Sequence, residues 1–378
     1  MSLPIYLDHA ATCPMDPRVL RAVVDVMQNV PGNPATHHRH GKQAKALVDD
    51  ARERVANLIG ADPDEILFTS GATESNNLAL KGIAWSGREH GRNHLVTAQT
   101  EHKAVRHTCE RLRPKGFQVS VIPVDENGCV DPDQLCKTIT DRTCVVSIMA
   151  ANNETGVLSD LGVLNHVCRA QGIPLHTDAA QAFGKIPLDV DELGVDMLSI
   201  SGHKIYGPKG IGALYVREGV PVQPQMDGGG QERGVRGGTL AVPSIVGLGV
   251  AAEIALHEMQ RDGAHCGQLR EVLVERLRRH APGLRVVGEK APRLPGTVAL
   301  CFPGVPASRL LEAVEPYVSA TSGSACSAGS ASPSHVLKAM GMPDELCLCT
   351  IRLSVGRFTT EQECVYAADQ IGAALKTV

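Results

Sequence analysis

Seven short runs of apolar and β-branched residues recur over the first 216 residues of the chain. They lie at 66–69, 94–97, 119–122, 144–148, 174–177, 197–200 and 213–216. Most are separated by one helix length, and Ala44, Val48, Ala51 and Val55 recur at helical spacing ahead of the first run. This alternation of strand and helix signals predicts βα repeats around a mostly parallel, seven-stranded sheet.

The pattern changes after a glycine-rich segment at 223–239. A helical pattern then runs from about residue 243 to 280, and strand signals follow near 297–301 and 350–354. We therefore expect an α/β protein with two domains: a large one over 15–250, and a smaller α+β one formed by 1–14 and 251–378. The smaller domain would carry a loop at about 319–334, where small polar residues show no apolar period.

Composition excludes several classes of protein. The chain has 378 residues, with 37 Lys and Arg against 41 Asp and Glu, a net charge of −4 that argues against a nucleic-acid-coating protein or a polybasic membrane binder. No apolar run approaches the roughly 18 residues of a membrane span, and residues 1–5 lack the pattern of a secretory signal. The 12 cysteines are scattered along the chain, which favours reduced thiols over disulfide bonds. We therefore expect a cytoplasmic protein.

Polar residues follow several of the predicted strands, where parallel sheets bind their ligands. The segment 69–76 passes through Gly71 into a helix whose free N–H groups would seat a phosphate, although Thr73 and Glu74 could simply cap that helix. The segment lacks the Gly-Lys-Ser/Thr of a nucleoside triphosphate loop. His102, after another strand, could carry protons or cap a helix.

Two further strand ends carry charged residues. Asp178 would be costly to bury without a cation, although it could also be a helix N-cap. Lys204 follows an apolar strand between turn residues, where desolvation would make its amine nucleophilic; the alternative is a solvated lysine. Together with the phosphate seat and His102, they predict a pyridoxal 5'-phosphate site, in which Lys204 forms a Schiff base and Asp178 keeps the pyridine nitrogen protonated.

Motifs along the whole chain then point to one family. The sequence resembles the cysteine desulfurases, which have the class V aminotransferase fold (fold type I of the pyridoxal phosphate enzymes), and most of all their iron–sulfur cluster assembly and nitrogenase maturation branch. The motifs that carry this resemblance lie at 6–8, 70–77, 101–105, 152–157, 201–212, 232–234 and 351–358.

The resemblance implies roles for individual residues. Lys204 would carry the cofactor, His102 would stack on its ring and move protons, Asp178 would pair with the ring nitrogen, and Gln181 would contact the ring hydroxyl. Thr73, Ser201 and His203 would hold the cofactor's phosphate, and Ala72 would also contact the cofactor.

The resemblance also implies contacts to the substrate and to a second subunit. Thr239 would reach the phosphate from the partner subunit, which implies a homodimer. Asn153 would contact the cofactor and, with Arg352, grip the substrate carboxylate, a task that suits the planar fork of arginine.

Cys326 is the predicted sulfur carrier. It lies in the small, polar segment 321–332, so a thiol there could visit a buried cofactor and then present sulfur outside. The resemblance implies that L-cysteine becomes L-alanine while Cys326 gains a persulfide, which passes to an acceptor protein of iron–sulfur cluster assembly, tRNA thiolation or DNA phosphorothioate modification. Cys347 and Cys349 read as a buried structural pair or as a second redox site.

Two other classes of function stay open at this point. One is a related pyridoxal phosphate enzyme, such as a selenocysteine lyase or another class V aminotransferase-type enzyme. The other is a metal or iron–sulfur carrier, suggested by 12 cysteines, 15 histidines and the cluster of His37, His38 and His40. These histidines lack the spaced Cys/His sets of a structural metal site, so a solvated turn fits them better.

Overall fold

A seven-stranded sheet forms the centre of the larger part of the molecule. The computed structural model describes residues 4–322 and 332–378. The sheet runs in the order β2-β8-β7-β6-β5-β3-β4, and β8 alone is antiparallel to its neighbours. Its strands are β2 (Ile66–Thr69), β3 (His94–Ala98), β4 (Gln118–Ile122), β5 (Thr143–Ser147), β6 (Leu175–Asp178), β7 (Met197–Ser201) and β8 (Gly212–Val216). The prediction of a mostly parallel sheet of seven strands is confirmed.

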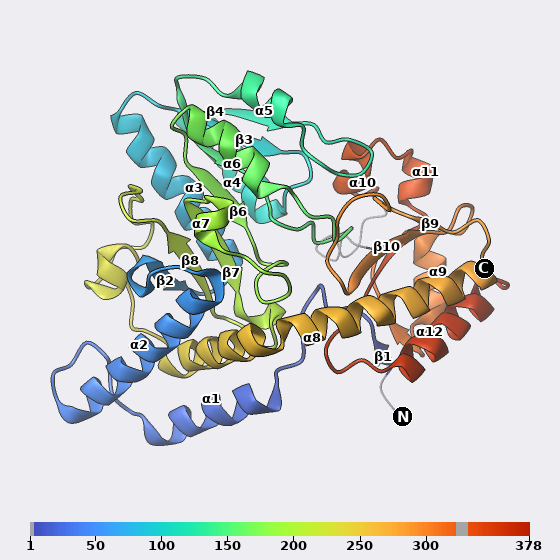
Figure 1. Cartoon of the computed structure of the whole chain (residues 1–378), viewed down its shortest axis with the longest axis horizontal. Helices are drawn as coiled ribbons and strands as arrows, with labels where there is room; N and C mark the ends of the chain where they lie inside the picture. Colours follow the sequence, from blue (N-terminus) through green and yellow to red (C-terminus); the bar gives the residue numbers. More distant parts are fainter. Residues whose placement is uncertain (1–3, 323–331) are drawn as a thin grey trace.

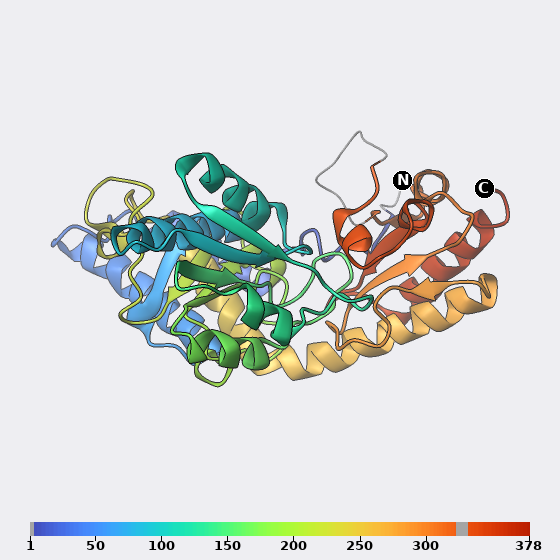
Figure 2. The same ribbon diagram turned by 90° about the horizontal axis from the view of Figure 1, so that it is seen from above.

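Helices cover both faces of this sheet (Figures 1 and 2). They are α1 (Pro17–Asn29), α2 (Arg39–Ile59), α3 (Ala72–Glu89), α4 (Lys103–Leu112), α5 (Pro132–Thr138), α6 (Leu161–Ala170), α7 (Val190–Leu193) and α8 (Val242–His280). Side chains of successive strand residues point to opposite faces. Leu67, Leu95 and Leu214 accordingly pack with α3 and α4, whereas their neighbours in the strands pack with α2, α6 and α8.

Four short 3-10 turns complete the larger part. They are η1 (Pro63–Glu65), η2 (Arg113–Lys115), η3 (Gly202–Lys204) and η4 (Gln231–Gly234). The turn η3 follows β7 directly, and it therefore lies at the carboxyl edge of the sheet, where ligands of such folds bind.

A smaller part of the molecule is built around the C-terminal half of α8. Its antiparallel sheet has the order β12-β10-β9, and β1 pairs with β11 in parallel. Its elements are β1 (Ile5–Tyr6), β9 (Arg285–Val286), β10 (Thr297–Cys301), α9 (Ala307–Val314), β11 (Val318–Ser319), α10 (His335–Ala339), α11 (Asp344–Cys347), β12 (Thr350–Ser354) and α12 (Glu361–Ala374). Figure 1 shows the N-terminal strand β1 beside these late elements.

The helix α8 belongs to two hydrophobic clusters. Its residues up to Ala255 pack with the seven-stranded sheet, and those from Cys266 to Leu277 pack with α9, α12 and the small sheet. A domain boundary at residue 250 stays a prediction. By length and composition α8 could cross a membrane, yet half of its most apolar window is buried inside the protein, as in a core helix.

Cys347 and Cys349 lie in a small apolar cluster beneath α10. Both are buried, and they pack near Cys301 and Met340. The Cys347 thiol donates to the Met342 carbonyl, 3.5 Å away, and burial raises its pKa to about 11. A thiol with that pKa stays protonated near neutral pH, which favours a structural role for Cys347, and Cys349 is buried in the same apolar cluster.

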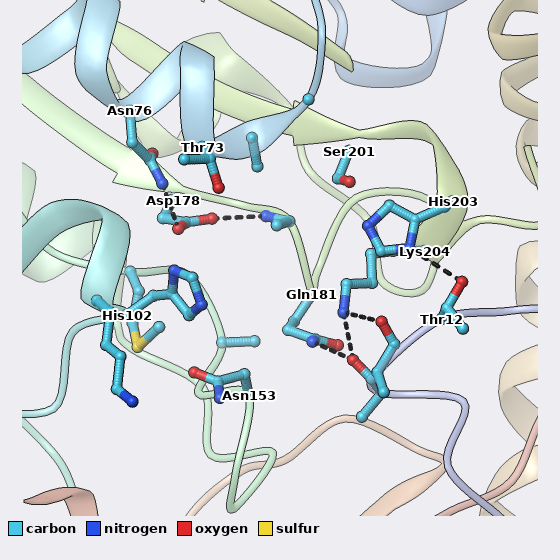
Figure 3. Close-up of a pocket in the computed structure, with 18 of the residues that line it drawn as sticks. Thr12, Thr73, Asn76, His102, Asn153, Asp178, Gln181, Ser201, His203 and Lys204 are labelled. Carbon is cyan, nitrogen blue, oxygen red and sulfur yellow. Dashed lines mark hydrogen bonds between the residues drawn. The ribbon is translucent and has the colours of Figure 1, made fainter. Parts of the chain in front are cut away.

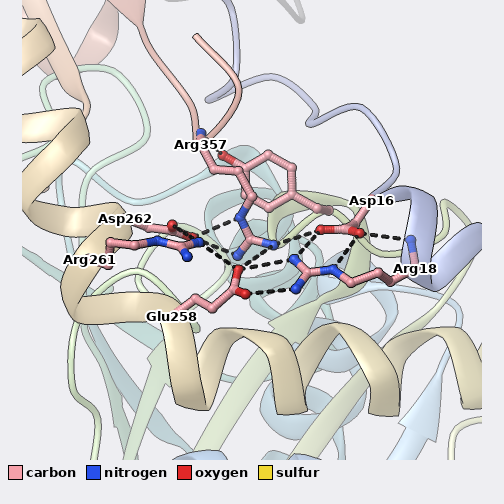
Figure 4. Close-up of polar contacts among 7 residues, drawn as sticks. Asp16, Arg18, Glu258, Arg261, Asp262 and Arg357 are labelled. Carbon is pink, nitrogen blue, oxygen red and sulfur yellow. Dashed lines mark hydrogen bonds and ion pairs between the residues drawn. The ribbon is translucent and has the colours of Figure 1, made fainter. Parts of the chain in front are cut away.

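A network of ion pairs with Arg357 and Asp16 at its buried centre joins the two parts (Figure 4). Arg357, in the loop after β12, contacts Asp16 at 3.0 Å and Asp262 of α8 at 2.7 Å. Its guanidinium lies 4.4 Å from the centre of the Tyr206 ring, and its backbone N–H donates to the Tyr206 hydroxyl. Hydrogen bonds from Arg18 lower the pKa of Asp16 to about 2.

The network holds an unusual backbone position. Tyr206 has φ of +65°, a left-handed conformation that costs a bulky residue of the order of 1–3 kcal/mol. Its carbonyl accepts the Asp16 N–H, and its ring lies against Arg357. Since Tyr206 is two residues from Lys204, the network also fixes the end of the turn that carries this lysine.

Replacing Arg357 should destabilise the protein strongly. Arg357→Met removes a cation that is 6% exposed and leaves Asp16 and Asp262 with less compensation, so we expect a loss of about 3–5 kcal/mol in unfolding free energy. Arg261→Met, in the same network but 70% exposed, should cost less than about 1 kcal/mol. Urea denaturation measures both, and equal losses would contradict this account of the network.

Candidate active site

One cavity of about 530 Å³ collects the polar residues that follow the strands (Figure 3). It lies where the seven-stranded sheet meets the N-terminal segment and β12. Ten of the twelve residues predicted from the sequence line it: Ala72, Thr73, His102, Asn153, Asp178, Gln181, Ser201, His203, Lys204 and Arg352. The structure therefore brings together residues that lie up to 280 positions apart in the chain.

One end of the cavity is the start of α3. Its N-cap residue, Gly71, has φ of +145°, which glycine alone adopts readily, and it makes no capping hydrogen bond through a side chain. Gly212 of β8 packs so closely that a Cβ there would lie 2.6 Å from the Gly71 Cα atom. Two glycines thus expose the positive end of a helix of 18 residues, and Thr73 stands beside it.

Asp178 lies at the carboxyl end of β6 and is 5% exposed. One carboxylate oxygen accepts a 2.6 Å hydrogen bond from the Asn76 side chain, and the other accepts the Ala180 N–H at 3.0 Å. No Lys, Arg or His forms an ion pair with it among residues 4–322 and 332–378. A buried carboxylate in this state favours a ligand that brings a positive charge.

Lys204 faces the middle of the cavity from η3. Its amine donates to the Ala10 carbonyl and, at 2.7 Å, to the Ala11 carbonyl. Burial first, and then the positive charges of Lys185 and Arg352, together lower its pKa to about 8. A lysine with that pKa has a substantial neutral fraction near pH 7, which a nucleophilic amine requires.

Two histidines stand on opposite sides of Lys204 in Figure 3. His102 is the N-cap of α4, and its Nδ1 accepts the Ala104 N–H at 3.1 Å. Burial lowers its pKa, against the charge of Asp178. His203 Nδ1 shares a 3.1 Å hydrogen bond with the Thr12 hydroxyl, and burial, with Lys204, lowers its pKa to about 4. Both rings are therefore neutral near pH 7, and the neutral His102 carries its proton on Nε2.

Arg352 reaches the cavity from β12, in the smaller part of the molecule. It is 3% exposed, and it donates to the Asn153 carbonyl at 2.6 Å and to the Asp8 carboxylate at 2.7 Å. Its Nε is buried and has no hydrogen-bond partner within the described part of the chain. Because Arg352 also lines the cavity, its guanidinium suits a carboxylate ligand.

Thr239 and Cys326 are the two predicted residues that remain. Thr239 is exposed and does not line the cavity of its own chain, so its predicted contact across a subunit interface stays a prediction. Cys326 lies outside the described residues, and nothing about its position follows from the structure.

The structure also adds residues that sequence reasoning gave no role. Asn76 lies one turn beyond Thr73 on α3. A polar residue on the buried face of that helix is the sequence feature that could have indicated its role. Ala10 and Ala11 contribute only carbonyl groups, for which the sequence holds no signal. Lys185 follows Gln181 by four residues, in a segment where a lysine would be expected to be exposed to solvent.

Comparison with known proteins identifies the family. The aminotransferase class-V family matches residues 5–366. A curated relative from Rickettsia akari (strain Hartford), named cysteine desulfurase IscS, is 48% identical over 98% of this chain and 91% of its own. The chain belongs to the cysteine desulfurases of aminotransferase class V. The predicted fold class and family are thereby confirmed.

Solved structures agree with this assignment. One titled NifS-like protein superposes with a TM-score of 0.92 at 37% identity and covers all of both chains. Another, titled SspA in complex with cysteine, has a TM-score of 0.83 at 36% identity and covers 94% of this chain and all of its own. Enzymes of this family depend on pyridoxal 5'-phosphate, which confirms the predicted cofactor.

The residues present fit this cofactor. The exposed start of α3 suits its phosphate, the buried Asp178 lacks the cation that a protonated pyridine nitrogen would supply, and Lys204 offers an amine of lowered pKa. A cavity of about 530 Å³ is within the usual size for a cofactor and a small substrate.

Removing the side chain of Asn76 should weaken cofactor binding. Asn76→Ala takes away the buried donor 2.6 Å from Asp178, a hydrogen bond to a charged group worth about 1.5–3 kcal/mol, so we expect the dissociation constant of pyridoxal phosphate to rise about 10- to 100-fold. Its neighbour Asn77 bonds only the Thr73 carbonyl, and Asn77→Ala should change the constant less than about threefold. Fluorescence titration of the apoenzyme measures both; equal values for the two variants would contradict this role of Asn76.

Proposed function

We propose that the chain is a pyridoxal 5'-phosphate-dependent cysteine desulfurase that converts L-cysteine to L-alanine and holds the sulfur as a persulfide on Cys326. The observation that carries this proposal is the single cavity shared by the start of α3, the buried Asp178, the amine of Lys204 and the guanidinium of Arg352. The curated relatives named cysteine desulfurase support the choice of L-cysteine among amino-acid substrates.

The proposed reaction balances without an added oxidant. The carbon–sulfur bond of cysteine breaks, a sulfur–sulfur bond to Cys326 forms, and a proton takes the place of sulfur on the β-carbon. The transferred sulfur is oxidised to the persulfide level while that carbon is reduced. When bound, pyridoxal phosphate supplies the electron sink for this exchange.

Lys204 and His102 are proposed to move the protons. With a pKa of about 8, roughly a tenth of the Lys204 amines are neutral at pH 7 and can accept a proton. His102 has its Nδ1 occupied by the Ala104 N–H, so Nε2 is the atom left to exchange a proton on the cavity side. These two groups lie on different sides of the cavity, as Figure 3 shows.

Arg352 and Asn153 are proposed to hold the substrate carboxylate. Arg352 comes from β12, and its hydrogen bond to the Asn153 carbonyl ties this strand to the larger part. Because the guanidinium is buried and already fixed by Asp8, little conformational entropy would be lost when a carboxylate binds.

The proposed partners follow from exposed groups. Thr239 is exposed in the glycine-rich segment, and α1 carries an exposed apolar stripe of Leu20, Val24 and Met27. Both observations support a homodimer in which Thr239 contacts the cofactor in the partner's cavity.

The sulfur acceptor is proposed to be a protein of iron–sulfur cluster assembly, tRNA thiolation or DNA phosphorothioate modification. A cytoplasmic location stays a prediction.

The alternative of a metal carrier has no support in the described residues. No three or more His, Cys, Asp and Glu side chains gather there as a metal site would require. The three histidines are exposed, as expected, but they do not form a turn: His38 caps α2 by accepting the Gly41 N–H, and His40 lies in the first turn of that helix.

Purified enzyme with L-cysteine and a thiol reductant should produce sulfide and alanine in equal amounts. We expect Lys204→Ala and Cys326→Ala to reduce both products more than about 100-fold, because each variant lacks a group that a bond-making step requires. The matched control Cys136→Ala removes the exposed thiol at 136 and should leave both rates unchanged. Alanine formed at the normal rate by Cys326→Ala, or a keto acid as product, would overturn the proposed function.

A further inference from the structure

A second lysine stands directly behind the cavity. Lys185 follows β6 by seven residues, in a turn where Gly184 has φ of +68° and packs against Ile205, the neighbour of Lys204. A Cβ on Gly184 would lie 2.8 Å from the Ile205 side chain. This close approach holds the turn bearing Lys185 against the turn bearing Lys204.

A continuous chain of hydrogen bonds connects the two lysines. The Lys185 amine donates to Gln181 Oε1 at 3.2 Å, and Gln181 Nε2 donates to the Ala10 carbonyl at 2.8 Å. The same Ala10 carbonyl accepts a hydrogen bond from Lys204. Because an ammonium group can only donate, Lys185 requires the oxygen of the Gln181 amide to face it, and the amide nitrogen then faces Ala10.

Lys185 has no carboxylate to neutralise it. It lines a small separate cavity of about 50 Å³, and Asp262, the acidic residue in that wall, is taken up by a 2.7 Å ion pair with Arg357. Among the described residues no acidic side chain forms an ion pair with Lys185 or Lys204. An unpaired positive charge on one lysine therefore disfavours a second positive charge on the other.

Other titratable groups surround this pair. Those that face the two lysines are Asp8, His9 and Cys13 from the N-terminal segment, His102 from the start of α4, His203 from η3, Tyr206 after it, Asp262 and Cys266 from α8, and Arg352 from β12. Burial lowers the pKa of both lysines most, and Arg352 adds to this effect whereas Cys13 opposes it. After burial, the positive charge of Lys185 is the strongest influence on the pKa of Lys204.

We propose that Lys185 is a positioning residue for the active site: its amine fixes the orientation of the Gln181 amide, and its positive charge behind the cavity disfavours a second positive charge on the amine of Lys204. This inference concerns the amine that the proposed function uses, but it rests on the geometry of the unliganded chain. It predicts that Lys204 becomes a poorer nucleophile when Lys185 loses its charge, and that Arg restores it.

The test measures the reactivity of Lys204 in the full-length apoenzyme. The protein is labelled with a trace of acetic anhydride from pH 6 to 10, and the labelled peptide that contains Lys204 is quantified by mass spectrometry. We expect half-maximal labelling near pH 8 in the unaltered chain. In Lys185→Met the midpoint should rise by about half a pH unit or more, which lowers labelling at pH 7 about threefold.

Two matched variants separate charge from general damage. Lys185→Arg keeps the charge and should return the midpoint to within about 0.2 pH units, whereas Lys137→Met, on the exposed side of α5, should not move it. If Lys185→Met does not fold by its thermal unfolding profile, Lys185→Gln takes its place and should give the same rise.

A second readout follows the bound cofactor. In the holoenzyme, the pH midpoint of the cofactor absorbance should also move in Lys185→Met and return in Lys185→Arg. An unchanged Lys204 midpoint in a folded Lys185→Met or Lys185→Gln apoenzyme would overturn the inference. If the unaltered enzyme fails to release sulfide from L-cysteine while the Lys204 midpoint still shifts, the proposed function falls and the inference about Lys185 stands.

Discussion

The buried carboxylate of Asp178 constrains the arrangement of the whole site. It lies at the end of a central strand, it is held by two hydrogen-bond donors, and it has no cationic partner among the described residues. Such a group is tolerated when a ligand supplies positive charge, and the protonated pyridine ring of the bound cofactor would do so. The exposed start of α3 is placed to take the phosphate at one end of this ligand.

The opposite requirement applies to Lys204. The proposed reaction needs its amine in the neutral form. This amine lies against the carbonyl groups of Ala10 and Ala11, and the positive charges of Lys185 and Arg352 lower its pKa more than the Asp8 carboxylate raises it. One cavity thus combines an uncompensated negative charge at Asp178 with positive charges near Lys204. This separation of charge favours an ionised carboxylate and a neutral amine within the same cavity of about 530 Å³.

Residues from both parts of the molecule complete the cavity. Arg352 and Arg357 come from one strand and the loop that follows it, and they meet Asn153 and Tyr206 of the larger part. The long helix α8 supports both hydrophobic clusters. A substitution in the smaller part that moves Arg357 would therefore also shift Tyr206, and with it the turn that carries Lys204.

Much of this arrangement could be predicted from the sequence. Each of the seven strands lies within one residue of its apolar run, because buried parallel strands are short and continuous in hydrophobicity. Lys204 and Asp178 were found because each directly follows such a strand. Asn76, Lys185 and the carbonyl of Ala10 were not, since their roles depend on contacts between segments far apart in the chain. Cys326 could be named from its motif, but its approach to the cavity lies outside the described residues.

The most direct test of the central claim is to find which lysine the cofactor joins. Holoenzyme is reduced with borohydride, digested, and mapped by mass spectrometry. The account predicts one pyridoxyl group per chain, on Lys204, because its amine has a lowered pKa and lies at the centre of the cavity. A pyridoxyl group on Lys185, Lys103 or Lys209 instead would contradict it.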